Sequence, residues 1–224
     1  KSEEVLAQGL AGIRSGGVYV SPWGDFNYIS STEKGRPYSQ AQSGAMIVVD
    51  VKTGKILSMA SYPAYDPNLF STGITATDWE SLKPEHENDQ LAARPLYNIA
   101  TQMAVQPGSI YKMVSAFTAL DNGLDPNLKI PDGGYVELNN QIFGCWLWNQ
   151  KRETHGPENL SDAIRDSCNY YFYSLGLGKD QRQDRDLGVR ISPQDLAEMS
   201  TQFGLGEATG MEIQIPKENT GTIP

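Results

Sequence analysis

The feature that most narrows the possible folds is a pair of apolar runs between residues 45 and 60, joined by a short turn. Ala45–Asp50 is rich in β-branched residues and predicts a buried strand. Val51–Gly54 has the composition of a turn, and Lys55–Ala60 returns as a second apolar run. Two such runs across a turn predict an antiparallel β-hairpin.

Helical periodicity follows in other segments, so the chain mixes strands with helices. The four predicted helices are Val5–Ile13, Met113–Leu120, Leu160–Leu175 with an interruption near Ser167, and Pro193–Phe203. The second carries an apolar stripe of Met113, Val114, Ala116, Phe117 and Leu120. Residues 15–43 predict a loop with short strands, 61–94 a long connection with one short helix near Asp78, and 129–157 an irregular segment.

The composition fits a soluble globular chain of one large or two small domains, with 224 residues of which 39% are hydrophobic. The 18 basic and 27 acidic residues give a net charge of −9 without a basic cluster, which excludes nucleic-acid binding. The sequence contains neither a signal peptide nor an apolar run long enough to span a membrane. Lys1–Leu6 reads like the middle of a helix, so we expect a piece of a longer protein.

A serine and a lysine three residues apart form the first candidate catalytic pair. Pro107-Gly108 predicts a turn into a helix, with Ser109 in its first turn and Lys112 on the same face. The positive end of the helix dipole favours an anion at Ser109, and a desolvated lysine can act as its base. This is the Ser-x-x-Lys arrangement of penicillin-recognising acyltransferases. The alternative is a capped helix with a surface lysine.

Ser167-Cys168-Asn169 is the second candidate, of the form Ser-x-Asn. A second hydroxyl can relay a proton, and an amide can hold a substrate carbonyl. The alternative is a kink in a helix.

Taken together, these motifs resemble the transpeptidase domain of class B penicillin-binding proteins of the elongation or sporulation type. Order and approximate spacing agree over most of residues 45–224. The further segments that carry the resemblance are Val49–Leu57, Met59–Ser61, Tyr65–Asn68, Leu96–Asn98, His155-Gly156, Phe203–Gly206 and Thr209-Gly210.

The resemblance implies the penicillin-binding-protein/β-lactamase-like α/β fold, an antiparallel sheet covered by helices with an all-helical subdomain. The Ser109 helix would be buried between them, with its N-terminus opening on the cleft. Residues 1–44 would form an N-terminal helix and an irregular lead-in, and residues 45–224 a partial transpeptidase domain without its C-terminal strands.

The implied activity is peptidoglycan D,D-transpeptidation through a serine acyl-enzyme, which β-lactams also form. Ser109 would be the nucleophile and Lys112 its base, Ser167 would relay the proton to the leaving amine, and Asn169 would orient the acyl amide and help hold Lys112. The implied partners are stem peptides, β-lactams and a membrane glycosyltransferase. The implied location is the outer face of the bacterial cytoplasmic membrane, with the anchor outside this chain.

One family motif is absent from the expected place, a Lys-Thr-Gly strand downstream of Ser-x-Asn. Lys52–Gly54 precedes Ser109 and falls in the predicted hairpin turn, and Asn219–Thr222 lacks the lysine. We therefore expect a chain that is truncated before this motif or whose remaining, disordered part is not included. We also expect an impaired enzyme, because one oxyanion donor would be missing.

A metal site is the third candidate. Cys145, His155 and Cys168 are residue types that zinc prefers, and Asp132 is a plausible fourth ligand. The resemblance implies a zinc at these positions, because some family members hold one with aspartate, histidine and cysteine. Buried free thiols and a disulfide are the alternatives. Trp146 and Trp148 stand at strand spacing beside Cys145, where they could line a substrate cleft or pack the loop.

Two other functions fit the same motifs. A serine β-lactamase of the same superfamily would need fast deacylation, and no deacylating base is evident. A β-lactam-sensing receptor domain would be acylated once and would signal without turnover. A turnover assay with a β-lactam separates the β-lactamase from the other two.

Overall fold

The computed structural model describes residues 1–15, 17–19, 26–28, 41–85, 87–88, 92–213 and 216–223. The chain divides into two compact units. The first comprises Lys1–Met103 with Glu212–Asn219, and the second comprises Ala104–Met211 with Thr220–Pro224.

The first unit is built on the predicted hairpin. Strands β3 (Gly44–Val49) and β4 (Ile56–Tyr62) pair antiparallel, with a register shift between Val48 and Val49. In their turn the N–H groups of Thr53 and Gly54 donate to the carbonyl oxygen of Asp50. Gly54 takes the left-handed conformation that a turn here requires, with φ +70°. Lys52-Thr53-Gly54 is therefore a turn, as its sequence indicates.

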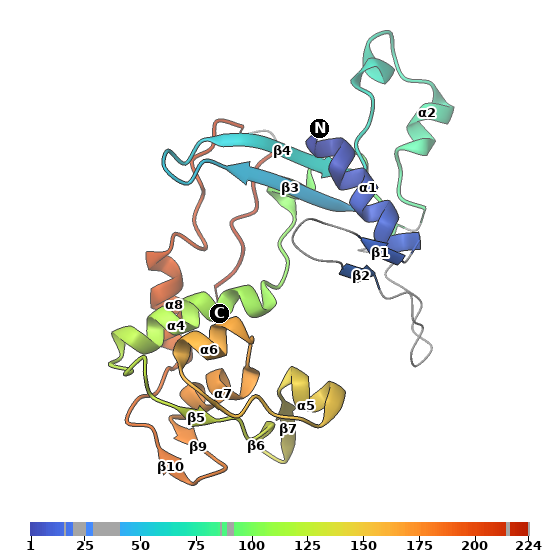
Figure 1. The fold of residues 1–224 in the computed structure, drawn as a ribbon. Helices are drawn as coiled ribbons and strands as arrows, with labels where there is room; N and C mark the ends of the chain where they lie inside the picture. Colours follow the sequence, from blue (N-terminus) through green and yellow to red (C-terminus); the bar gives the residue numbers. More distant parts are fainter. Residues whose placement is uncertain are drawn as a thin grey trace. The chain divides into compact units, whose positions relative to one another are not determined.

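Helix α1 (Ser2–Ser15) packs against this hairpin (Figure 1). The close approach is at Gly44, where an added Cβ would lie 3.4 Å from the side chains of Leu6 and Leu10. Leu10 of the helix and Ala60 of β4 are buried. A small residue at the start of β3 thus lets the helix lie close to the sheet.

The prediction that Ala45–Asp50 is a buried strand is wrong for the described part of the chain. Ile47, Val48 and Val49 are each more than 40% exposed. Among the described residues β3 pairs with β4 alone, and the helices that pack against the pair are α1 and the four-residue helix α3 (Ile99–Gln102). β-Branched composition reports strand propensity, but burial depends on how many layers cover the strand.

The remaining elements of the first unit are short. They are β1 (Gly17–Tyr19) paired with β2 (Phe26–Tyr28), the 3₁₀ turn η2 (Pro67–Phe70), α2 (Ala76–Ser81) and α3 (Ile99–Gln102). Helix α2 confirms the short helix predicted near Asp78, and Thr75 caps it. The loop predicted over 15–43, part of the expected N-terminal lead-in, lies mostly outside the described residues.

Helices form the core of the second unit. They are α4 (Lys112–Asp121), preceded by the 3₁₀ turn η3 (Gly108–Tyr111), then α6 (Leu160–Arg165), α7 (Asn169–Leu177) and α8 (Pro193–Gln202). Figure 1 shows α4 running beside α6 and α8. Capping boxes start two of them, with Asn159 at α6 and Ser192 at α8. These helices confirm the three predicted for this part of the sequence.

The buried face of α4 differs from the predicted stripe. Val114 and Ala116 are buried, whereas Met113, Phe117 and Leu120 are each at least 40% exposed. Together with Met199 and Phe203 of the α8 segment, Phe117 and Leu120 line an open apolar depression. Periodicity identified the helix, but the packing decided which part of its apolar surface is buried.

The segment 129–157 contains regular structure that its sequence does not indicate. Strand β6 (Tyr135–Leu138) pairs with β7 (Gln141–Gly144), β5 (Ile130–Pro131) pairs with β8 (Pro157–Glu158), and α5 is Trp146–Lys151. Strand β9 (Lys179–Asp180) pairs with β10 (Arg185–Asp186). Trp146 and Trp148 therefore lie on a helix, and the strand that their spacing suggested is wrong. Elements of two to six residues are too short to produce a periodic pattern.

None of the helices in the described residues is both long enough and apolar enough to cross a membrane.

Candidate active site and metal cluster

Ser109 lies at the entrance to α4. It stands in η3, immediately after Gly108, whose φ of +58° turns the chain into the helix. Ser109 is exposed, and Lys112 begins α4 itself with its side chain half-buried. The turn therefore presents the hydroxyl to solvent and leaves the lysine behind it, within the unit.

A chain of hydrogen bonds joins the four predicted catalytic residues. The Lys112 ammonium donates to three acceptors: the Ser167 carbonyl oxygen at 2.7 Å, Asn169 Oδ1 at 2.6 Å and Ser167 Oγ at 3.0 Å. Ser167 Oγ in turn donates to Ser109 Oγ at 3.0 Å. These hydrogen bonds connect the candidate nucleophile to the candidate base through the second serine.

Ser167 stands at a strained break between two helices. Its φ is +52°, in the left-handed region that non-glycine residues rarely occupy. The N–H of Ser167 donates to Ile164 O at 3.2 Å, and that of Cys168 donates to Ala163 O at 2.9 Å. These two bonds end α6 in a Schellman motif with serine at the position that glycine usually takes. This break directs the Ser167 side chain toward Lys112.

Two opposing effects act on the Lys112 ammonium. Burial lowers the pKa of Lys112 from its ordinary value, while negative charge at Cys145, Cys168 and Glu158 raises it, and burial prevails. The ring of Phe172, with its centroid 5.6 Å from Nζ, adds a favourable cation–π contact to the charged form. The lysine is therefore well held as a donor but loses its proton more readily than an exposed lysine.

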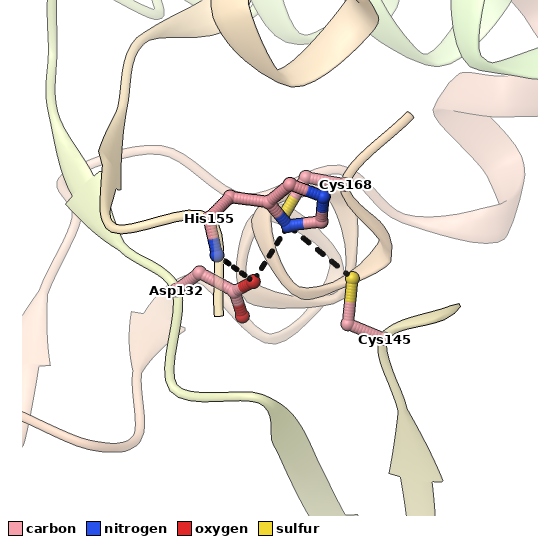
Figure 2. A group of neighbouring side chains, drawn as sticks. All are labelled: Asp132, Cys145, His155 and Cys168. Atoms are coloured by element: carbon pink, nitrogen blue, oxygen red, sulfur yellow. Dashed lines mark hydrogen bonds and ion pairs between the residues drawn. The ribbon is translucent and has the colours of Figure 1, made fainter. Parts of the chain in front are cut away.

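A second cluster lies directly behind this network. One ligand atom from each of Asp132, Cys145, His155 and Cys168 lies within 4.8 Å of the other three. Figure 2 shows the four side chains converging, with His155 Nδ1 2.8 Å from Asp132 Oδ2 and 3.8 Å from Cys145 Sγ. The structure thus brings together all four residues predicted as metal ligands.

The donor set and its surroundings fit a zinc ion. Zinc prefers thiolate, imidazole and carboxylate ligands in a tetrahedron, and both thiols are buried and free of a disulfide. Hydrogen bonds hold the ligands: Gly134 N–H donates to Asp132 Oδ1 at 2.8 Å, and His155 N–H donates to Asp132 Oδ2 at 3.0 Å. The unused His155 Nε2 is buried without a hydrogen-bond partner. The two hydrogen bonds to the Asp132 carboxylate are of the kind that orient metal ligands.

The surroundings of Cys145 favour the thiolate form of its side chain. A hydrogen bond from the Cys168 thiol, with backbone N–H groups of Tyr170 and Asn169, lowers the pKa of Cys145 against the opposing effect of burial. A thiolate is the form that binds a metal. The Asn169 N–H donates to Cys145 Sγ at 3.3 Å, so the cluster and the catalytic network share a backbone group.

Residues 44–224 match the family described as the penicillin-binding protein transpeptidase domain. The match covers more than half of the chain. The chain belongs to the penicillin-binding protein transpeptidase family.

The relatives agree with this assignment. The chain is 37% identical over 182 residues to the peptidoglycan D,D-transpeptidase MrdA of Haemophilus influenzae, covering 81% of this chain and 25% of the relative. It is 35% identical over 184 residues to MrdA of Acinetobacter baumannii, covering 81% of this chain and 24% of the relative. The chain thus spans about a quarter of the length of these relatives.

A similar solved structure is the penicillin-binding protein PBP2 of Helicobacter pylori. The TM-score is 0.66 at 32% identity, over 81% of this chain and 30% of that one. The chain therefore has the penicillin-binding-protein/β-lactamase-like α/β fold, in agreement with the resemblance drawn from the sequence.

The structure adds a neighbour to the candidate active site that the motifs do not include. Glu158 is 2% exposed, and neither of its carboxylate oxygens has a hydrogen-bond partner. Burial raises the pKa of Glu158. It follows Pro157 in the two-residue strand β8, where no periodic pattern marks it as buried. Its neighbourhood is created by the folding of 129–157 onto α6, which the sequence does not reveal.

The turn that follows Asp132 contains Gly134, and its geometry lets us predict how substitution of this glycine affects stability. Gly134 has φ +85°, and an added Cβ would lie 2.6 Å from the Trp148 ring. We expect Gly134→Ala to lower the free energy of unfolding by at least about 1–2 kcal/mol, because the left-handed conformation alone costs that much with a side chain.

Gly176 in α7 is the matched control, since nothing lies within 4 Å of an added Cβ. Gly176→Ala should be neutral or stabilise by about 0.5–1 kcal/mol. Urea unfolding of both variants measures the difference, and equal stabilities would contradict the described turn.

Proposed function

We propose that this chain is the part of a peptidoglycan D,D-transpeptidase that carries its acylated serine. The observation that carries the proposal is the hydrogen-bonded connection from Ser109 through Ser167 to Lys112. The names of the relatives support it, as does a solved imipenem acyl-enzyme complex of penicillin-binding protein A of Mycobacterium tuberculosis, which is 25% identical over 73% of this chain.

In the proposed acylation, Ser109 Oγ attacks the carbonyl carbon of the amide between the two terminal D-alanines of a stem peptide. The hydroxyl proton moves through Ser167 Oγ to the neutral amine of Lys112. The Ser109 N–H, in the first turn of η3, stabilises the oxyanion of the tetrahedral intermediate. The same path then runs in reverse, so that the departing nitrogen receives a proton as the C–N bond breaks and D-alanine leaves.

The acyl-enzyme then passes to an acceptor. An amine of a neighbouring stem peptide attacks the ester carbon, the bond between that carbon and Ser109 Oγ breaks, a proton from the amine passes to Ser109 Oγ, and an amide cross-link forms. Asn169 has two roles in this scheme. Its Oδ1 holds Lys112 at 2.6 Å, and its NH₂ group donates to the carbonyl of the acyl chain.

We further propose that Asp132, Cys145, His155 and Cys168 hold one zinc ion. Four protein ligands leave no position for water, so the ion would be structural and would supply no catalytic water. The buried, converging donors support this assignment. Because Cys168 lies between Ser167 and Asn169, the cluster would hold the backbone from which both catalytic side chains project.

The proposed partners are stem peptides, β-lactams that acylate the same serine, and a glycosyltransferase in the membrane. A solved structure entitled structural coordination of polymerization and crosslinking by a peptidoglycan synthase complex is 27% identical to this chain, with a TM-score of 0.69. Another holds PBP2 of Helicobacter pylori with MreC. The proposed location is the outer face of the bacterial cytoplasmic membrane.

We expect penicillins to acylate Ser109 in the intact protein, because this hydroxyl ends the hydrogen-bond chain and is exposed. Intact-mass measurement should detect one adduct per chain, and Ser109→Ala should abolish it. Ser115, an α4 residue whose hydroxyl donates to Tyr111 O, is the control, and Ser115→Ala should keep the adduct. An adduct that still forms on the Ser109→Ala variant would contradict the assignment of Ser109 as the acylated residue. Slow release of the acyl group would separate a transpeptidase or a receptor from a β-lactamase.

We expect the acylation rate to rise with pH as Lys112 loses its proton. Because burial lowers the pKa of Lys112, the midpoint of this rise should lie below 10.5, the ordinary value. Lys112→Arg keeps the charge but not the base, and should slow acylation about 100-fold or more. Exposed Lys129 is the control, and Lys129→Arg should retain the rate. An arginine variant at position 112 with the original pH profile would show that another group is the base.

We expect one zinc per chain in protein purified without chelators or a metal-affinity tag. Elemental analysis measures it, and removal of the metal should lower thermal stability and slow acylation together. Cys145→Ser should reduce the zinc content, whereas Glu153→Gln, an exposed acid near His155, should keep it. Protein without stoichiometric zinc, in which both thiols react freely, would contradict the zinc site and would support the alternative that Cys145 and Cys168 are buried free thiols.

A further inference from the structure

We propose that Trp146 is a positioning residue for acylation, because its indole N–H holds the peptide group on which Ser167 stands. The Trp146 Nε1–H donates to the carbonyl oxygen of Asp166 at 2.9 Å. This inference rests on the proposed function, in which Ser167 transfers the proton between Ser109 and Lys112.

The strained residue needs support from outside its own helix. Ser167 keeps a φ of +52° without the freedom of glycine, and such a conformation persists only where surrounding contacts determine it. The Schellman bonds use the carbonyl groups of Ala163 and Ile164. The carbonyl of Asp166 lies beyond them, at the C-terminal end of α6, where a helix has no backbone donor to offer. The Trp146 indole supplies that donor.

Two successive residues of one segment hold both sides of Ser167. Trp146 binds the carbonyl before it, and Cys145 Sγ accepts the N–H of Asn169 after it, at 3.3 Å. The Lys112 ammonium binds the carbonyl of Ser167 itself at 2.7 Å. The peptide groups around Ser167 are therefore held from α5 and from α4, two elements distant from it in the sequence.

The contact is suited to positioning and contributes little to the core. Trp146 is 38% exposed, and its ring meets His155 edge to face with centroids 5.4 Å apart. Phenylalanine keeps an aromatic ring at this position but has no N–H donor. Arg165 binds the carboxylate of Asp166, not its carbonyl, and cannot replace the indole.

Loss of the donor should free the Asp166 peptide group to rotate and Ser167 to leave the left-handed region. Ser167 Oγ would then no longer lie within 3.0 Å of both Ser109 Oγ and Lys112 Nζ. Misplacement of a proton-transfer group by about 1 Å can slow a reaction on the order of 100-fold. We expect a decrease of about 10- to 100-fold in the acylation rate constant, with the affinity of the preceding noncovalent complex unchanged.

The test compares Trp146→Phe with Trp148→Phe in the intact protein. Trp148 lies on the same helix, where its ring contacts Tyr135 and Arg152. Acylation by a penicillin is followed over a concentration series, which separates the rate constant from the dissociation constant, and zinc content and melting temperature are measured in parallel. Trp146→Phe should slow the rate constant alone, and Trp148→Phe should leave it near the wild-type value.

Two outcomes would overturn the inference. One is wild-type acylation by Trp146→Phe, and the other is a loss of rate that appears only with a matching loss of zinc or melting temperature, as expected for a merely structural residue. Should the variant not fold, hydrogen exchange of the indole N–H in the wild-type protein still decides. Slow exchange supports the bond to Asp166, and exchange at the rate of a free indole contradicts it. Failure of the wild-type protein to be acylated at Ser109 would instead reject the proposed function.

Discussion

The three hydrogen bonds of the Lys112 ammonium are the contact on which the rest of the candidate site depends. They join the first turn of α4 to the break between α6 and α7. An ammonium group has three N–H donors, one for each of the three acceptors, so the lysine satisfies the whole network when it is charged. Because it is half-buried, the same group remains capable of giving up a proton. Structural and chemical roles therefore coincide in one side chain.

The break at Ser167 explains why so many interactions converge on this part of the second unit. The left-handed conformation is unfavourable for a serine. Contacts made by other elements supply the free energy that offsets this cost. Lys112 reaches it from α4, and Cys145 and Trp146 reach it from the start of α5. The four converging side chains of the proposed zinc site include Cys168, which belongs to the same turn. A zinc ion bound there, as we propose, would stiffen the backbone at both catalytic side chains.

The corrections to the sequence analysis share one physical origin. The apolar runs of β3 and the stripe on α4 were correctly assigned to a strand and a helix, but parts of both are exposed among the described residues. Propensity and periodicity arise within a segment, whereas burial depends on what packs against it. The short elements within 129–157 were not predicted from the sequence, because their conformation comes from tertiary contacts rather than from a local pattern.

By itself the sequence determined the hairpin around residues 44–62, the helices α1, α2, α4, α6, α7 and α8, the break at Ser167 and the eight residues of the two candidate sites. These are local signals, namely turn chemistry, apolar periodicity and short motifs whose spacing is fixed along the chain. Only the tertiary structure decided that Ser167 stands between Ser109 and Lys112, that Trp146 reaches Asp166, and that Glu158 is buried without a hydrogen-bond partner. Each of these facts joins residues or elements far apart in sequence, and such contacts arise only when the packing of helices brings the segments together.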